Sequence, residues 1–272
     1  TLVTPGATNS ISDNLNIVID TTLPTISSVN SSATNGDFKE GDGIPITIQF
    51  DEVVTVTGTP QLTLETGSTD RFAEYVSGTG TDTLTFNYTV QSGDNSTDLD
   101  YTGTTSLSLN SGAIQDAAGN NATLTLVTPG ATNSISDNQA IVIEAVAPTI
   151  TDQAADAGTK IITLTTSEAV TGTPNTTDFT VLMNGVGNTV TKARVLGTSI
   201  TLTLTNAISN NETLTVDYSK AAGKEISDTA GNELLSIGDA LSVTVTNDST
   251  VPSVSGVSST NGDNSYGIGG VI

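Results

Sequence analysis

Apolar and polar residues alternate along most of this chain, in short runs rich in Val, Ile, Thr and Tyr. Successive side chains of a β-strand point to opposite faces, so this alternation predicts half-buried strands. Gly, Asn and Asp turns separate the runs, no convincing helical stretch interrupts them, and their spacing favours an antiparallel β-sandwich. The predicted strands are residues 44–50, 61–65, 83–90, 161–166, 199–205, 213–218 and 241–245.

A long internal repeat organises the chain. Residues 1–14, TLVTPGATNSISDN, recur unchanged as residues 125–138, and the match continues from 17–19 to 141–143. A period this long, with its own turns and strands, corresponds to a whole domain rather than to a short structural repeat. We therefore expect the chain to be a window on a tandem array.

Three similar joints, at Pro24, Pro148 and Pro252, mark the expected domain boundaries. Proline fixes φ and keeps such a linker extended. We expect the C-terminal end of a preceding repeat, a first full domain of type 1, a second full domain of type 2, and the start of a further type 1 repeat. Their ranges are 1–23, 24–147, 148–251 and 252–272.

Composition argues against an enzyme. The chain has no Cys, no His and no Trp, and only 4% of its residues are aromatic. The usual ligands of zinc and haem are therefore missing, as is the Ser-His-Asp type of triad. A glycosidase would also need aromatic platforms that this chain lacks, so we expect no catalytic residues.

Charge restricts the partners. With 7 basic against 29 acidic residues the net charge is −22, which would repel nucleic acid and anionic lipid alike. No run approaches the 18 apolar residues of a membrane span, so we expect no membrane insertion. Cations are the natural partners of such a chain.

Two motifs occur once in each full domain. A Glu follows the predicted strands 44–50 and 161–166, taken as the second strand of each domain, in FDEVV (50–54) and TSEAV (166–170), and I-x-D-x-A-G-N occurs at 114–120 and 226–232. These signatures resemble the bacterial immunoglobulin-like repeats of giant secreted or surface adhesins. With V-D-Y-S at 216–219 and I-S-D-T-A-G-N-E-L at 226–234, the second domain is similar to the SwmB-type repeat.

The resemblance implies a fold and a context. It implies all-β, immunoglobulin-like antiparallel sandwiches arranged end to end, in an extracellular or cell-surface protein. In such proteins the repeats form a stalk, and calcium at the domain joints commonly stiffens it. The implied partners are neighbouring immunoglobulin-like repeats of the same or adjacent chains, with glycans or surface proteins contacted through a tip outside this sequence.

Strand count suggests where calcium would bind. In a domain of seven strands that run up and down, the loop after the second strand and the loop before the last strand lie at the end where the chain enters. Ca²⁺ requires six to eight oxygen ligands, which two loops and a linker could supply. D-x-A-G-N is equally a good turn, with Asp accepting backbone N–H groups, so both interpretations stand. The candidate ligands are Asp20, Glu52 and Asp116 at one joint and Glu144, Glu168 and Asp228 at the next.

A second acidic cluster and two tyrosines have simpler interpretations. The cluster's irregular spacing does not fit an EF-hand loop, so solvated acidic loops at the opposite end of the first domain are expected. Tyr101 and Tyr218 each follow an Asp in corresponding strands, and we expect packed rings whose hydroxyls bond nearby backbone. The cluster comprises Asp37, Glu40, Asp42, Asp94, Asp98 and Asp100.

These observations predict a structural extender, a stalk segment that spaces a binding tip from the cell and is stiffened by calcium. One alternative is a subunit of a self-assembling extracellular filament, sheath or surface layer. The other is a module that binds a polysaccharide or a host protein. Residues 1–23 and 252–272 supply only parts of domains, so we expect both tails to pair with neighbouring copies or with a longer chain.

Overall fold

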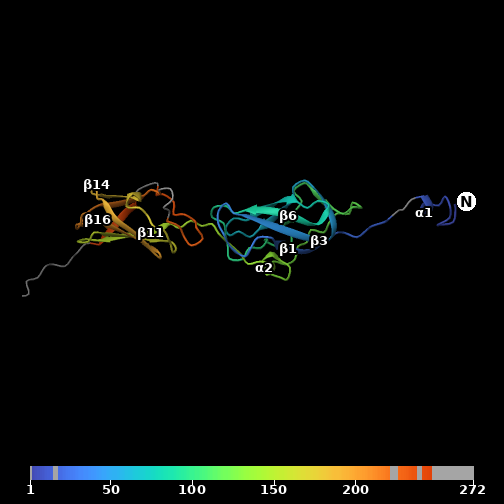
Figure 1. Cartoon of the computed structure of the whole chain (residues 1–272), viewed down its shortest axis with the longest axis horizontal. Coiled ribbons are helices and arrows are strands. Elements are labelled where there is room, and N and C mark those ends of the chain that lie inside the picture. Colours follow the sequence, from blue (N-terminus) through green and yellow to red (C-terminus); the bar gives the residue numbers. More distant parts are fainter. Residues whose placement is uncertain (1, 15–17, 221–225, 238–240, 247–272) are drawn as a thin grey trace, which may run out of the picture.

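A computed structural model of the chain describes residues 2–14, 18–220, 226–237 and 241–246. The described chain is all-β, with 45% of residues in strands and 4% in helices. Its strands form two units, each around its own apolar core, which Figure 1 draws one beyond the other along the long axis. The expected domain start at residues 252–272 lies outside the described residues.

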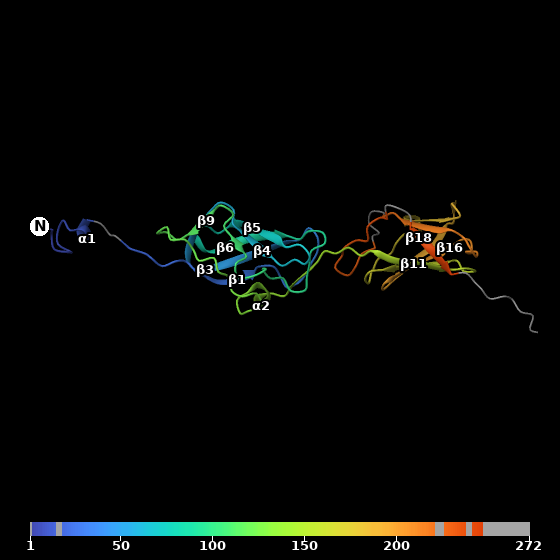
Figure 2. The ribbon, with the colours of Figure 1, turned by 180° about the vertical axis from the view of Figure 1, so that it is seen from behind.

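The first unit consists of ten strands and one short helix. Figure 2, turned by 180° from Figure 1, shows its strands β4, β5 and β6 most clearly. In chain order the elements are β1 (Ile26–Ser31), β2 (Gly36–Phe38), β3 (Gly43–Thr57), β4 (Gln61–Leu64), β5 (Arg71–Ser77), β6 (Thr81–Thr89), β7 (Asn95–Ser96), β8 (Leu107–Ser108), β9 (Ala113–Gln115), α2 (Ile135–Asn138) and β10 (Ile141–Glu144).

Two sheets build this unit. One has the order β1-β3-β6-β5-β4-β8, with β9 paired to the second half of β3. The other has the order β2-β10-β7, and its central strand β10 runs parallel to β2 and antiparallel to β7. The last strand of the unit is therefore fixed on both of its edges.

The second unit is a single curled sheet. Its strand order is β14-β13-β17-β18-β11-β12-β16-β15, and β18 runs parallel to β11. A 3₁₀ turn, η1 (Thr176–Asp178), precedes β13. The strands are β11 (Ile150–Asp156), β12 (Ile161–Thr166), β13 (Phe179–Met183), β14 (Val186–Gly187), β15 (Val190–Leu196), β16 (Ser199–Leu204), β17 (Leu214–Tyr218) and β18 (Leu241–Thr246).

The expectation of a purely antiparallel arrangement is wrong at one place in each unit. The pairs β2–β10 and β11–β18 are parallel. Each pair joins a strand near the start of its unit to the last strand of that unit. Because the chain enters a unit at one end and leaves it at the other, these strands run in the same direction.

The seven predicted strands all fall on observed strands, and their alternation builds the cores. Along the first half of β3 the buried side chains are Ile44, Ile46, Ile48 and Phe50, every second residue. The residues between them face outward, as period-two patterning requires. The same alternation along β16 buries Ile200, Leu202 and Leu204.

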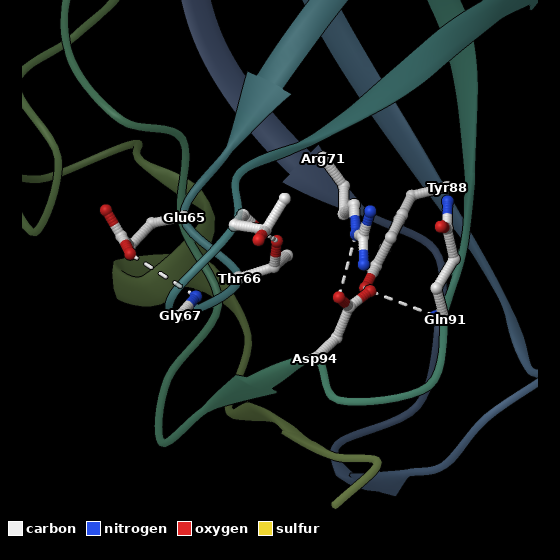
Figure 3. A network of polar contacts seen from close by, with 8 residues as sticks. Glu65, Thr66, Gly67, Arg71, Tyr88, Gln91 and Asp94 are labelled. Atoms are coloured by element: carbon white, nitrogen blue, oxygen red, sulfur yellow. Dashed lines mark hydrogen bonds and ion pairs between the residues drawn. The ribbon is translucent and has the colours of Figure 1, made fainter.

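A buried ionic network fixes one end of the first unit (Figure 3). The carboxylate of Asp94 is 1% exposed and accepts from Nε of Arg71 at 2.8 Å and from the hydroxyl of Tyr88 at 2.6 Å. The backbone N–H of Gln91 donates to the same carboxylate at 2.9 Å. Burial and these contacts with Asp94 raise the pKa of the Tyr88 hydroxyl, so it remains a donor. Asp94 is thus a structural residue.

Candidate metal centres at the two joints

Three carboxylates converge where the chain enters the first unit. One oxygen from each of Asp20, Glu52 and Asp116 lies within 4.8 Å of the others. Asp20 precedes β1, Asp116 follows β9, and Glu52 lies within β3. Glu52 was expected in a loop, but the strand continues past it to pair with β9. Its place is a register irregularity between Gln49 and Val54, which turns the backbone at this point.

The same arrangement recurs between the two units. Oxygens of Glu144, Glu168 and Asp228 lie within 4.8 Å of one another. Glu144 is the last residue of β10 in the first unit, and Glu168 follows β12 in the second. This group therefore draws one carboxylate from one unit and two from the other.

A tight turn positions the aspartate of the first group. The carboxylate of Asp116 accepts from the backbone N–H of Asn120 at 2.8 Å and from its side-chain amide at 2.7 Å. Gly119 adopts φ 92°, in the left-handed region that favours glycine. The Asn120 amide also donates to the backbone carbonyl of Asp20 at 3.2 Å, and so ties the turn to the incoming chain.

The second turn repeats these contacts. The carboxylate of Asp228 accepts from the backbone of Asn232 at 2.8 Å and from its amide at 2.9 Å. Gly231 also donates to it, at 2.7 Å. The Asn232 amide donates to the carbonyl of Glu144 at 2.9 Å and also contacts the Glu144 carboxylate. One amide thus joins the first unit to the turn of the second.

Sequence reasoning did not assign this role to Asn120 and Asn232. It identified both as members of the D-x-A-G-N turn, a turn that the structure contains. The bridging contact depends on a linker carbonyl, which every residue carries, so no side-chain signal marks it. The only signal in the sequence is that the D-x-A-G-N turn occurs once in each unit, at 114–120 and at 226–232.

The carboxylates of the first group differ in the direction of their pKa shifts. Burial, followed by the charges of Asp116, Asp20 and Asp51, raises the pKa of Glu52. Burial acts the same way on Asp116, but the hydrogen bonds from Asn120 outweigh it and leave the pKa of Asp116 lowered. The aspartate is therefore held as an anion next to a glutamate for which the anionic form is unfavourable.

The second group shows the same division. Burial and the charge of Asp228 raise the pKa of Glu168. Burial also raises the pKa of Glu144, and its contact with Asp228 adds to this. At Asp228 burial is outweighed by hydrogen bonds from Asn232, so its pKa is lowered. Such a group lacks positive charge, which a bound cation or a proton would supply.

Lys39 of the first unit lies close to the second turn. A β-carbon built on Gly231 would be 3.2 Å from Nζ of Lys39. The lysine side chain is flexible and could move away from a side chain at position 231, so the requirement for glycine there comes from its φ of 93°. The two units therefore meet around the Asp228 turn.

The second predicted acidic cluster does not gather into one site. Among the described residues, the groups at the two joints are the only ones in which three carboxylates lie within 4.8 Å. Asp94 and Asp100 are buried, so the expectation of solvated loops was wrong for these two. Asp42 instead accepts from the backbone N–H of Lys39 at 2.9 Å.

The tyrosines have packing roles. Tyr101 is 1% exposed, and its hydroxyl donates to the carbonyl of Val127 at 2.7 Å, as the tyrosine-corner interpretation required. The ring of Tyr218 packs against Phe179, with centroids 5.2 Å apart. The two rings belong to the apolar cores of the first and second units.

Part of the second unit matches a known repeat family. Residues 171–223 match the SWM_repeat family model, described as "Putative flagellar system-associated repeat". This agrees with the SwmB-type resemblance of the second domain. No curated protein matches the chain. In the described part of the chain, no helix combines the length and apolar character needed to cross a membrane.

Proposed function

We propose that this chain is an extender segment of a large extracellular surface protein, in which tandem immunoglobulin-like sandwiches are held end to end by calcium ions at their joints. The observation that carries the proposal is the group of Glu144, Glu168 and Asp228. It combines one carboxylate of the first unit with two of the second and lies where the units meet. An ion bound there would couple the orientation of one unit to that of the next.

The chemistry of the donor set supports calcium. Carboxylate and carbonyl oxygens are hard ligands, which Ca²⁺ prefers, and the chain contains no His or Cys that would favour a transition metal. The carbonyl of Glu144 accepts from the Asn232 amide, whose residue also holds the Asp228 carboxylate. Water would complete the six to eight oxygens that calcium takes.

Repetition of the site supports a mechanical role. Both groups combine a residue before the unit, a glutamate near its second long strand and the aspartate of the D-x-A-G-N turn. Each ion would replace a flexible linker by a bridged one, and a series of such joints would give a stiff rod. The net charge of −22 would oppose close approach of units unless cations reduce it.

Small-angle scattering of the full chain tests this function. We expect the maximum dimension and the scattering of a stiff rod in millimolar Ca²⁺, and the profile of a hinged pair in chelator. Sodium chloride at the ionic strength of the Ca²⁺ buffer separates ion binding from screening. Identical profiles in all three buffers would contradict a calcium-stiffened extender.

A further inference from the structure

A groove lies on the outer face of the first unit, over the neighbouring strands β5 and β6. Ala73 lies in the first core, so the residues on either side of it in β5 point outward. Phe72 and Val76 are 54% and 61% exposed, and Glu74 between them is exposed as well. We call Phe72, Glu74 and Val76 the β5 row. The groove has a volume of about 500 Å³, and its lining includes Asp70, Phe72, Glu74, Val76, Asn87 and Gln91.

Hydrogen bonds beneath the groove fix its walls. The side chain of Arg71 and the backbone N–H of Gln91 both donate to the buried carboxylate of Asp94, at 2.8 and 2.9 Å (Figure 3). Tyr75 also lines the groove, and its hydroxyl accepts from the backbone N–H of Thr79 at 2.9 Å. A surface whose side chains are already held in place loses less entropy when it binds.

The charged groups of the groove leave it acidic. Arg71 already forms an ion pair with Asp94. Asp70 and Glu74 form no ion pair within the described part of the chain. The groove therefore presents two carboxylates beside two exposed apolar side chains. This combination suits a surface that carries basic and apolar side chains together.

Strand β15, at the edge of the sheet in the second unit, has such a surface. Ala193 and Val195 pack against the second core, so Lys192, Arg194 and Leu196 point outward. All three are exposed, Leu196 to 67%. Lysine on an edge strand discourages further strand pairing, which leaves the outward side chains rather than the backbone as the contact surface. We call Lys192, Arg194 and Leu196 the β15 row.

Two of the few positive charges of this chain lie in the β15 row. The whole sequence has 7 basic residues against 29 acidic ones. Within the described residues only Arg71 and Lys220 form ion pairs, so Lys192 and Arg194 have no acidic partner there. Copies of a chain with a net charge of −22 repel one another in most orientations. Contact is least opposed where the β15 row of one copy meets the carboxylates of another.

The two rows also match in spacing. Each consists of three alternate residues of one strand, so the side chains recur at the same interval. When the two sheet faces pack with these strands parallel, an ion pair forms at the centre, with an apolar contact on one side and a contact of a cation with an aromatic ring on the other. The pairs are Arg194 with Glu74, Leu196 with Val76, and Lys192 with Phe72.

We propose that the groove of the first unit binds the β15 row of the second unit in another copy of this chain, so that chains associate side by side. The two units lie one beyond the other along the long axis (Figure 1), so the β15 row does not reach the groove of its own chain. Each chain keeps one free groove or one free β15 row after binding a neighbour, and the association is therefore open-ended. This inference goes beyond the extender role and does not depend on calcium.

A single contact of this kind is weak. Its ion pair lies at the surface, where water and salt screen it. We therefore expect association at high protein concentration and its loss in concentrated NaCl. Where several copies of the contact act together, as along two chains lying side by side, their effects multiply.

Engineered cysteines test the contact, because the chain has none of its own. Full-length Val76→Cys and Leu196→Cys chains are mixed, one of them with a longer affinity tag, so that heterodimers and homodimers differ in mass. A short bismaleimide, whose span matches the roughly 10 Å between packed sheets, links the thiols, and electrophoresis separates the products. We expect a heterodimer whose yield rises with protein concentration.

Two controls measure random collision. Val53→Cys replaces Val76→Cys in the first chain, and 53% of its native side chain is exposed. Leu235→Cys replaces Leu196→Cys in the second chain, and its native side chain is 67% exposed, as Leu196 is. We expect both control pairs to give about tenfold less heterodimer, which corresponds to a modest contact free energy. A yield from either control equal to that of the test pair would overturn the proposal.

Charge reversal tests the central ion pair. Arg194→Glu in the Leu196→Cys chain should lower the yield to that of the controls, and so should Glu74→Arg in the Val76→Cys chain. Both side chains are exposed, so the reversals leave the two cores intact. Mixing the two reversed chains should restore the heterodimer, because the ion pair is rebuilt with opposite signs. Unchanged yield with Arg194→Glu, or no recovery in the doubly reversed pair, would also overturn the proposal.

Discussion

Ile11 and Ile135 occupy the same position of two identical fourteen-residue sequences, yet Ile11 is 69% exposed and Ile135 is fully buried. Both follow a serine and lie at the start of a short helix, α1 (Ile11–Asn14) or α2. Their local sequence is the same, so only tertiary packing distinguishes them. Comparing the two isoleucines therefore separates the local structure that the fourteen residues form by themselves from the burial that the first unit provides.

The first prediction uses this pair. Ile135→Ala should lower the free energy of unfolding of the first unit by about 2–5 kcal/mol, because it leaves a cavity among packed side chains. Ile11→Ala should change it by less than about 0.5 kcal/mol, because Ile11 is 69% exposed and outside the first core. Urea unfolding at low concentration measures both. Equal effects would mean that the two isoleucines have similar environments.

Many of the strands could be predicted from the alternation of apolar and polar residues. Where this prediction fails, the failure has a physical cause. The run at 44–50 predicted the first half of β3, but the strand continues to Thr57. Asp51 and Glu52 break the apolar alternation there while the backbone goes on pairing. Strand β5 was not predicted, because Phe72 and Val76 are exposed and place apolar residues on both of its faces.

The candidate site was predicted from strand count rather than from spacing along the sequence. Glu52 and Asp116 are 64 residues apart, and they were expected together because an up-and-down sandwich brings their two loops to the end where the chain enters. The parallel pairing of β2 with β10 could not be predicted from the sequence pattern, because the direction of these strands follows from the path of the chain through the unit. Sequence patterning reports which side chains are buried and says less about which strands they join.

A second prediction concerns the buried network in Figure 3. Asp94→Ala should destabilise the first unit by about 2–4 kcal/mol, because the Tyr88 hydroxyl loses its partner in the core and Arg71 loses its ion pair. Asp82→Ala on the exposed face of β6 is the matched control and should stay within about 0.5 kcal/mol. Thermal unfolding compares them. A cost as small as that of Asp82→Ala would show that the network contributes little.

A third prediction separates calcium binding from a simple turn. Burial and the charge of Asp228 raise the pKa of Glu168, so its ionised form is less favourable here than in solvent unless a cation offsets these effects. Glu168→Gln should therefore raise the unfolding midpoint in chelator and reduce the gain that millimolar Ca²⁺ produces. For a bound ion at a hundredfold excess over Kd, that gain is about 2.7 kcal/mol in the parent.

The control for this experiment is Asp98→Asn, at an acidic residue outside both joint groups. It should leave the calcium-dependent gain unchanged. Magnesium at the same concentration tests selectivity, because Mg²⁺ demands near-octahedral geometry and gives up its water ligands reluctantly. If Glu168→Gln and the parent gain equally from Ca²⁺, the group at the second joint is not the site that binds it.

The last prediction distinguishes the two joints. Asp228→Ala should loosen the hinge between the two units, because it removes a carboxylate of the second group and the acceptor that holds the Asn232 amide against Glu144. Asp116→Ala removes the same kind of turn at the first joint, outside that hinge, and is the matched control. Scattering in millimolar Ca²⁺ should therefore show a broader range of distances between the units for Asp228→Ala alone. If the two variants give the same profile as the parent, the turn at Asp228 does not set the angle between the units.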